Sequence, residues 1–207
     1  MIEKNADPKE RLTAAQDIRA NLLQSSRTLA ATAEDSEIIA RMSEVLLKTL
    51  RQGGRILTCG NGGSACDAQN FADELVGRFE RNRPPLSAIA LTVNSSDLTA
   101  ISNDFGFETV FERQLEAHGR SGDTLVAIST SGNSENVLRA AKKAHELGLN
   151  VLGFSGKTGG KLKTLCGICL CVPSDKTSHV QDTHIAVIQT LCGVIEDALF
   201  PHAPKAH

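Results

Sequence analysis

The sequence contains no apolar run that approaches the roughly 20 residues needed to cross a bilayer, and its first residues, MIEKNADPKERL, are too polar for a secretory signal peptide. It also lacks an excess of charge of either sign, because 22 Lys and Arg face 24 Asp and Glu. This balance argues against a protein that mainly coats nucleic acid or an anionic membrane. We therefore expect a cytoplasmic protein without a nucleic-acid or membrane partner, whose ligands are bound locally and specifically.

The sequence also lacks the pattern of a disulfide framework or a zinc finger. Six cysteines lie in apolar surroundings of a chain for which we expect no export; they are Cys59, Cys66, Cys166, Cys169, Cys171 and Cys192. The stretch CGICLC contains one C-x-x-C pair, but no second pair stands at zinc-finger spacing. We therefore expect reduced thiols and predict no metal at this cluster.

A length of 207 residues allows one sizeable core, and there is no repeat, linker or low-complexity tract. Residues 9–51 have apolar positions at helical spacing, with Asp35 or Ser36 as a cap between two helices. Beyond them, apolar runs of strand length alternate with helical stretches, the clearest at 134–148 and the last at 179–199; the runs are RILTCG, SAIALTV, TLVAIST, NVLGFSG and ICLCVPS. The alternation predicts an α/β fold with a five-stranded parallel sheet covered on both faces.

Two polar loops follow predicted strands and lead into predicted helices. The first strand is followed by GNGGSA, residues 60–65, and the third by STSGNSEN, residues 129–136. Small residues allow close approach to the backbone, and a helix N-terminus offers free N–H groups and the positive end of a dipole. Four hydroxyl side chains stand within six residues of the second loop, at Ser129, Thr130, Ser131 and Ser134. Together the loops predict a site for a phosphorylated small molecule at the carboxyl edge of the sheet.

Neither of two nucleotide motifs is complete, so we predict no nucleotide cofactor. GNGGSA fits G-x-G-x-x-A, but the acidic residue expected about 20 positions on is missing, since Glu80 precedes the second strand. GFSGKTGGK places Val151 where the phosphate-loop motif needs its first glycine. We interpret this stretch as a turn with Lys157 or Lys161 at the surface.

Four motifs in this order resemble the sugar-isomerase (SIS) domain of the phosphoheptose isomerase family: CGNGGSACDAQ, NDFGFETVF, STSGNSENV and VPSDKTSHVQDTHIAVIQ. The resemblance implies an N-terminal helical segment at 1–34, an SIS domain at 35–200 and a tail at 201–207. It implies a flavodoxin-like three-layer sandwich with extra N-terminal helices, assembled as a homotetramer with active sites between subunits. The implied activity is conversion of D-sedoheptulose 7-phosphate to D-glycero-D-manno-heptose 7-phosphate, for the heptose of lipopolysaccharide.

The resemblance also assigns roles to individual residues of this sequence. Asn61, Gly62 and Gly63 would line the sugar site, and Asn103 and Asp104 would contact the sugar. The hydroxyl loop would hold the phosphate with Ser129, Thr130, Ser131 and Ser134. Glu74 and Gln181 match polar residues of the reaction centre, where they would also bind substrate.

This sequence departs from the family at two positions of that reaction centre. The family carries His at the positions of Asn70 and Gln189, and the second His is the acid–base partner of the glutamate. Where the family holds zinc, the implied ligands are these two imidazoles with Glu74 and Gln181. A carboxamide is a much poorer zinc ligand than imidazole and does not exchange protons near neutral pH, so zinc at this site is doubtful.

Three interpretations of these two changes remain open. The chain could be an isomerase that uses Glu74 as base and takes its second proton group from water, Asp104, His184 or Asp182. It could be a non-catalytic SIS protein that binds a sugar phosphate or a protein, as in the replication-initiator-associating type. The imidazoles could also have been replaced by design, since both amides are near-isosteric. The retained Glu74 favours the enzyme, with position 189 as the second catalytic position.

Overall fold

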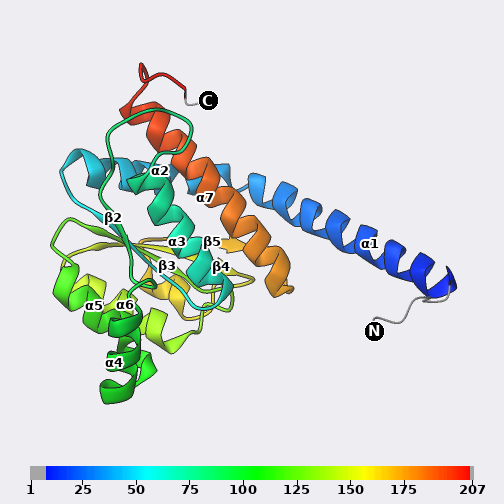
Figure 1. Ribbon diagram of the computed structural model, residues 1–207, viewed down its shortest axis with the longest axis horizontal. Coiled ribbons are helices and arrows are strands. Elements are labelled where there is room, and N and C mark those ends of the chain that lie inside the picture. The colour runs from blue at the N-terminus through cyan, green and yellow to red at the C-terminus, as the bar shows by residue number, and fades with distance from the viewer. Residues whose placement is uncertain (1–7, 206–207) are drawn as a thin grey trace.

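The computed structural model describes residues 8–205, so the ends of the predicted segments 1–34 and 201–207 lie partly outside the described residues. Its helices are α1 (Pro8–Ala33), α2 (Ser36–Arg51), α3 (Gly63–Val76), α4 (Ser95–Phe105), α5 (Val110–His118), α6 (Glu135–Glu146) and α7 (Thr177–Leu199) (Figure 1). The strands are β1 (Ile56–Cys59), β2 (Ala88–Ala90), β3 (Thr124–Ile128), β4 (Asn150–Gly156) and β5 (Ile168–Val172). Two short 3₁₀ helices, η1 (Phe107–Thr109) and η2 (Leu162–Leu165), complete the described elements.

The five strands form one parallel sheet in the order β2-β1-β3-β4-β5. This is the flavodoxin-like order, in which the direction of winding changes between β1 and β3. The predicted five-stranded parallel sheet is therefore confirmed. At the change of direction the loops that follow β1 and β3 leave the sheet side by side, which creates a crevice for a ligand.

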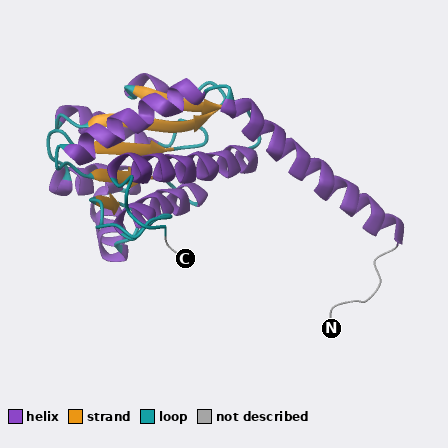
Figure 2. Cartoon of the chain, turned by 90° about the horizontal axis from the view of Figure 1, so that it is seen from above, coloured by secondary structure: helices purple, strands orange, loops and turns teal. Residues whose placement is uncertain are grey.

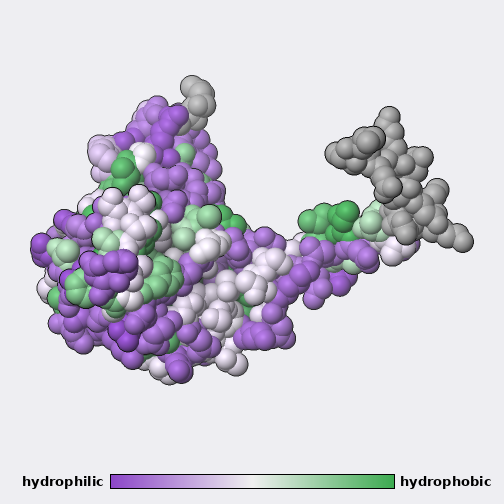
Figure 3. All heavy atoms as spheres, turned by 60° about the horizontal axis from the view of Figure 1, so that its bottom comes forward, coloured by the Kyte–Doolittle hydropathy of each residue, from purple (hydrophilic) through white to green (hydrophobic). Residues whose placement is uncertain are grey.

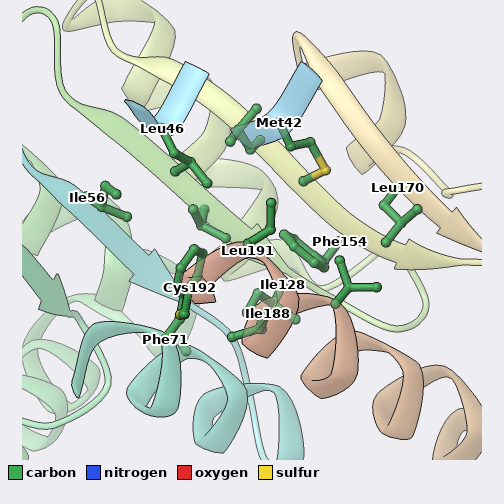
Figure 4. Packing of buried hydrophobic residues seen from close by; sticks show 14 of the residues in the cluster. Met42, Leu46, Ile56, Phe71, Ile128, Phe154, Leu170, Ile188, Leu191 and Cys192 are labelled. Atoms are coloured by element: carbon green, nitrogen blue, oxygen red, sulfur yellow. The ribbon is translucent and has the colours of Figure 1, made fainter. Parts of the chain in front are cut away.

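Helices cover both faces of the sheet, which gives three layers (Figure 2). On one face α2, α3 and α7 pack over strand residues such as Ile56, Ile128 and Phe154, with Phe71 and Leu191 inserted from the helices (Figure 4). On the other face α5 and α6 pack over alternate strand residues, including Leu57 and Leu125. Burial on both faces explains why the strands are continuous apolar runs in the sequence.

The long helix α1 leaves the sandwich and projects away from it (Figure 1, Figure 2). The second half of α1 is tied to the body, where Ser25 Oγ donates to Asp182 Oδ2 at 2.7 Å and His179 Nε2 lies 2.9 Å from Asn21 Oδ1. Leu12, Ile18 and Leu22 are 65%, 61% and 64% exposed. Figure 3 shows hydrophobic surface on this projecting helix.

The two N-terminal helices and the last helix differ from their predicted bounds only in detail. The expected break between two N-terminal helices occurs at residues 34–35, and Asp35 occupies the N-cap position of α2 without a capping hydrogen bond from its side chain. The last helix begins at Thr177, two residues before the expected start. Within residues 8–205, no helix is both long enough and apolar enough to span a bilayer.

Candidate active site

The loops after β1 and β3 meet at the point where the sheet changes direction. Asn61 and Asn136 join them with two reciprocal hydrogen bonds: Asn61 Nδ2 donates to Asn136 Oδ1 at 2.8 Å, and Asn136 Nδ2 donates to Asn61 Oδ1 at 2.9 Å. Asn136 is buried in the first turn of α6 and also accepts from the backbone N–H of Val137. The two polar loops thus form one continuous wall.

The loop after β3 gathers its hydroxyl groups in front of the N-terminus of α6. Ser129 Oγ lies 3.0 Å from Ser134 Oγ and 3.5 Å from Ser131 Oγ. Ser134 is the N-cap residue of α6, yet its side chain makes no capping hydrogen bond. Thr130 and Ser131 line a hollow of about 300 Å³ beside this loop. Hydroxyl donors and free helix N–H groups in one place suit a phosphate dianion.

The turn at residues 156–162 supports this hydroxyl loop through backbone hydrogen bonds. Gly156 N–H donates to Thr130 O at 3.0 Å, and Leu162 N–H donates to Gly132 O at 2.9 Å. Gly132 has a φ of +65°, and a Cβ there would lie 2.0 Å from Gly159 O. The turn therefore has a supporting role, and its Lys157 and Lys161 are exposed as predicted.

The second wall of the crevice is the interface of α3 and α7, which run side by side (Figure 1). Gln189 Nε2 donates to Asn70 Oδ1 at 3.2 Å. At the first residue of α3, a Cβ on Gly63 would lie 2.1 Å from Gln181 Oε1, so only glycine lets Gln181 approach the loop this closely. Asn70, Glu74, Gln181 and Gln189 thus come from two helices to one interface.

Glu74 is the half-buried carboxyl group of this interface, one turn after Asn70 on α3. Burial is the main cause that raises the pKa of Glu74 above its usual value, and the charge of Asp73 adds to it; a hydrogen bond with Asn70 opposes the rise. A carboxylate with a raised pKa is a better proton acceptor than an ordinary one. The position and environment suit a general base.

Asn103 and Asp104 lie elsewhere in this chain. Both are exposed on α4, where Asn103 Nδ2 donates to Asp104 Oδ1 at 2.7 Å. Helix α4 packs against η1 and α5 and lies at the bottom of Figure 1, below α5 and α6. Among the described residues, no hydrogen bond links either side chain to the two loops. The chain alone therefore does not bring these two residues to the crevice.

Two of the three side chains considered for the second proton group are engaged elsewhere. His184 is fully buried, its Nε2 lies 3.1 Å from Ser155 O, and burial lowers the pKa of His184 to about 4. Its ring stands edge-on to Phe154 with centroids 5.6 Å apart, so it packs on the sheet. Asp182 is exposed and accepts the hydrogen bond from Ser25. Neither is available beside Glu74.

Comparison with known proteins identifies the family of this chain. A family model described as SIS domain matches residues 22–156. A phosphoheptose isomerase of Rhodospirillum rubrum is 53% identical over 161 residues, which cover 78% of this chain and 86% of the relative. One from Campylobacter jejuni is 54% identical over 169 residues, covering 80% and 91%. The chain belongs to the phosphoheptose isomerase family of SIS-domain proteins.

Solved phosphoheptose isomerases have the same fold. The enzyme from Neisseria gonorrhoeae is 41% identical, superposes with a TM-score of 0.84, and the match covers 89% of this chain and 99% of that one. The enzyme from Francisella tularensis is 37% identical with a TM-score of 0.86, covering 89% and 98%. The flavodoxin-like SIS fold expected from the sequence is thus confirmed.

The donor set of this phosphoheptose isomerase relative does not fit zinc. Gln189 Nε2 donates to Asn70 Oδ1, which occupies the oxygen through which the Asn70 amide could bind a metal. Across residues 8–205, no three His, Cys, Asp or Glu side chains are grouped as a metal site. Glu74 and Gln181 alone would provide one anionic and one weak neutral ligand, which is too few for a tetrahedral zinc site.

Sequence reasoning missed Asp67, which lies on α3 between Gly63 and Asn70. Asp67 is 4% exposed, and its Oδ2 has no hydrogen-bond partner. Burial, with a smaller contribution from the charge of Asp182, raises the pKa of Asp67 to about 6. Its spacing of three residues from Asn70 and seven from Glu74 is the only signal in the sequence, and an isolated Asp at that spacing is ordinary on a helix.

Proposed function

We propose that the chain isomerises D-sedoheptulose 7-phosphate to D-glycero-D-manno-heptose 7-phosphate, as part of the carbohydrate metabolism that supplies bacterial lipopolysaccharide heptose. The observation that carries this is the position of one raised-pKa carboxyl, Glu74, at a helix interface beside two joined polar loops. The family membership supplies the reaction class, a ketose–aldose isomerisation.

In the proposed mechanism the phosphate binds at the hydroxyl loop and the sugar extends toward α3 and α7. Ser129, Thr130, Ser131, Ser134 and the N-terminus of α6 hold the phosphate, and Asn61, Gly62 and Gly63 line the sugar. Glu74 removes a proton from the carbon next to the carbonyl group, which gives an enediol, and returns it to the neighbouring carbon. The side-chain amides of Asn70, Gln181 and Gln189 donate hydrogen bonds to the substrate oxygens, and water moves the hydroxyl proton.

We propose that this reaction proceeds without zinc at the α3–α7 interface. The support is the chemistry of the donor set, because amides at positions 70 and 189 replace the imidazoles that resemblance would place there. Loss of an acid–base imidazole slows proton transfer, and such groups contribute about a hundred- to ten-thousandfold. The chain is therefore expected to be a slower isomerase than relatives with His at both positions.

We also propose that the functional unit is a homotetramer in the cytoplasm. The exposed leucines of α1 and an apolar groove of about 640 Å³ between α1, α2 and α7 support association with further copies. Asn103 and Asp104 could then reach the crevice of a neighbouring subunit from exposed α4. Six unpaired cysteines support a reducing compartment.

A non-catalytic sugar-phosphate-binding protein is the second candidate, and the two amides at the reaction centre favour it. A ³¹P NMR assay with D-sedoheptulose 7-phosphate separates the two functions. We expect a new heptose 7-phosphate signal that Glu74→Gln lowers by about a hundred- to ten-thousandfold while leaving binding intact. Binding without turnover by the unmodified protein would support the second candidate.

A further inference from the structure

Glu74 lies in the last turn of α3, two residues before the helix ends at Val76. The last carbonyl groups of a helix have no partner within it, and helix ends fray. The last turn of α3 contains no basic residue, and the C-cap Gly77 has a negative φ of −75°, so the common left-handed glycine cap is not used here. A base in this turn therefore needs support from outside α3.

Arg83 supplies that support from the segment that follows α3. Its Nη2 donates to Glu74 O at 2.6 Å and its Nη1 donates to Leu75 O at 2.8 Å. The Arg83 side chain is only 1% exposed, so these bonds are sheltered from water. A guanidinium at this end of α3 also carries the charge that the helix dipole favours.

Glu196 of α7 fixes Arg83 in turn. Arg83 Nε donates to Glu196 Oε1 at 2.8 Å, and the Glu196 side chain is 2% exposed. The same carboxylate accepts three backbone N–H groups, from Phe79 at 3.0 Å, Glu80 at 2.6 Å and Arg81 at 2.7 Å. Glu196 therefore folds the whole 79–83 segment against α7.

The two helices are thus tied together on either side of Glu74. One tie is the hydrogen bond between Gln189 and Asn70, a turn before Glu74. The other runs from Glu196, seven residues after Gln189 and on the same face of α7, through Arg83 to the backbone of Glu74. We propose that Arg83 and Glu196 are positioning residues that fix the Glu74 carboxylate at the substrate.

This inference rests on the proposed function, in which Glu74 is the base. A reacting group that is misplaced by 1 Å can lose about a hundredfold in rate. The pair touches neither the hydroxyl loop nor the sugar-lining loop, so its loss should slow proton transfer without weakening substrate binding. A merely structural pair would instead change the free energy of unfolding and leave kcat of the folded protein unchanged.

The chain offers a matched control in the neighbouring pair Arg81–Asp197. Arg81 Nη2 lies 2.6 Å from Asp197 Oδ1, and it joins the same segment to the same helix. Asp197 is 68% exposed, and the side-chain bonds of Arg81 go to Asp197 and Ala203 O, not to α3. Removing this pair also takes away one ion pair between the segment and α7, but it leaves the end of α3 capped.

The test measures kcat and KM for D-sedoheptulose 7-phosphate in Glu196→Gln, Arg83→Lys and the control Asp197→Asn, all at a temperature where each variant is folded. We expect kcat to fall between about tenfold and a hundredfold in the first two variants with KM within about twofold, and the control to match the unmodified protein. If Glu196→Gln does not fold, Arg83→Lys decides, since it keeps the charge and loses the two-pronged donor.

Unchanged kcat in folded Glu196→Gln and Arg83→Lys, or a rise in KM alone, would overturn the inference. If the unmodified protein shows no turnover, the proposed function fails separately. The inference is then judged by crystal structures of Arg83→Lys and Asp197→Asn. It stands if Glu74 leaves its place beside Asn70 in Arg83→Lys only, and it falls if Glu74 keeps its place in both.

Discussion

Asp67 is a single residue whose contribution to the free energy of unfolding depends on pH. Because the pKa of Asp67 rises from 3.8 to about 6 on folding, the folded state holds more protons than the unfolded state between these values. Asp67 therefore makes its full contribution to the free energy of unfolding below about pH 4. This contribution is lost as the pH rises through 6. His184 has the opposite effect, since the pKa of His184 falls from 6.5 to about 4 and its stabilisation is complete above 6.5.

Asp67→Asn should remove the first of these two opposing effects. Relative to the unmodified protein, we expect the free energy of unfolding of the variant to improve by about 1–3 kcal/mol between pH 4 and pH 7. Urea unfolding at both pH values measures the change. A variant whose stability difference from the unmodified protein is the same at pH 4 and pH 7 would show that Asp67 is ionised at its normal pKa in the fold.

At the residue scale, the sequence allowed prediction only where a motif brings several residues together. The hydroxyl loop and Glu74 stand in such motifs, and their assigned roles stay predictions until substrate is bound. The buried Asp67 and the Arg83–Glu196 pair could not be predicted, because the partners of Glu196 lie 113 to 117 residues away and no pattern marks them. His184 and Asp182 were open alternatives for the second proton group. Only the folded structure shows that His184 lies against Ser155 O and that Asp182 accepts from Ser25.

At the scale of elements, the strands were predictable and several supporting contacts were not. The five predicted apolar runs contain all five strands, so β1 to β5 could be located from the sequence. The pattern is clearest for β1, β3 and β4, which are buried along nearly their whole length. The turn at 156–162 was expected as a surface turn, and its support of the hydroxyl loop depends on contacts with Gly132 that sequence spacing does not reveal. Helix α4 was not predicted from the sequence. Asn103 and Asp104 lie on its exposed surface and not in the crevice.

The facing positions on α3 and α7 offer a test of how the two helices are aligned. Asn70 and Gln189 already touch, so imidazoles at both positions would stand beside Glu74 and Gln181. We expect Asn70→His with Gln189→His to bind close to one zinc per chain, measured by elemental analysis after dialysis, and to raise kcat. The single variant Asn70→His is the control and should bind zinc weakly. A double variant without zinc and without a faster rate would mean that positions 70 and 189 are wrongly matched to the two His positions of the family.

At the scale of the whole molecule, α1 is the element whose apolar side chains the single chain leaves exposed. Its exposed leucines and the apolar groove beside α7 would not persist on an isolated monomer without cost. Leu29 lines that groove and is 42% exposed. A partner copy that packs on this surface would bury it. In the proposed tetramer, the partner's α4 would also lie near the crevice of this chain.

Leu29→Glu should therefore break the proposed tetramer into smaller species. A charge buried at an apolar interface without a partner is strongly unfavourable. Light scattering after size-exclusion chromatography measures the mass, and Gln52→Glu, which adds the same charge at an exposed position at the end of α2, is the control. We expect the isomerase rate to fall together with the mass, and a tetramer unaffected by Leu29→Glu would place the interface elsewhere.

The most direct test of the account is a crystal structure of Glu74→Gln soaked with D-sedoheptulose 7-phosphate. We expect the phosphate to lie among Ser129, Thr130, Ser131 and Ser134, and the first two sugar carbons to lie beside residue 74. A ligand bound away from this loop, or one whose carbonyl end points away from α3 and α7, would contradict it.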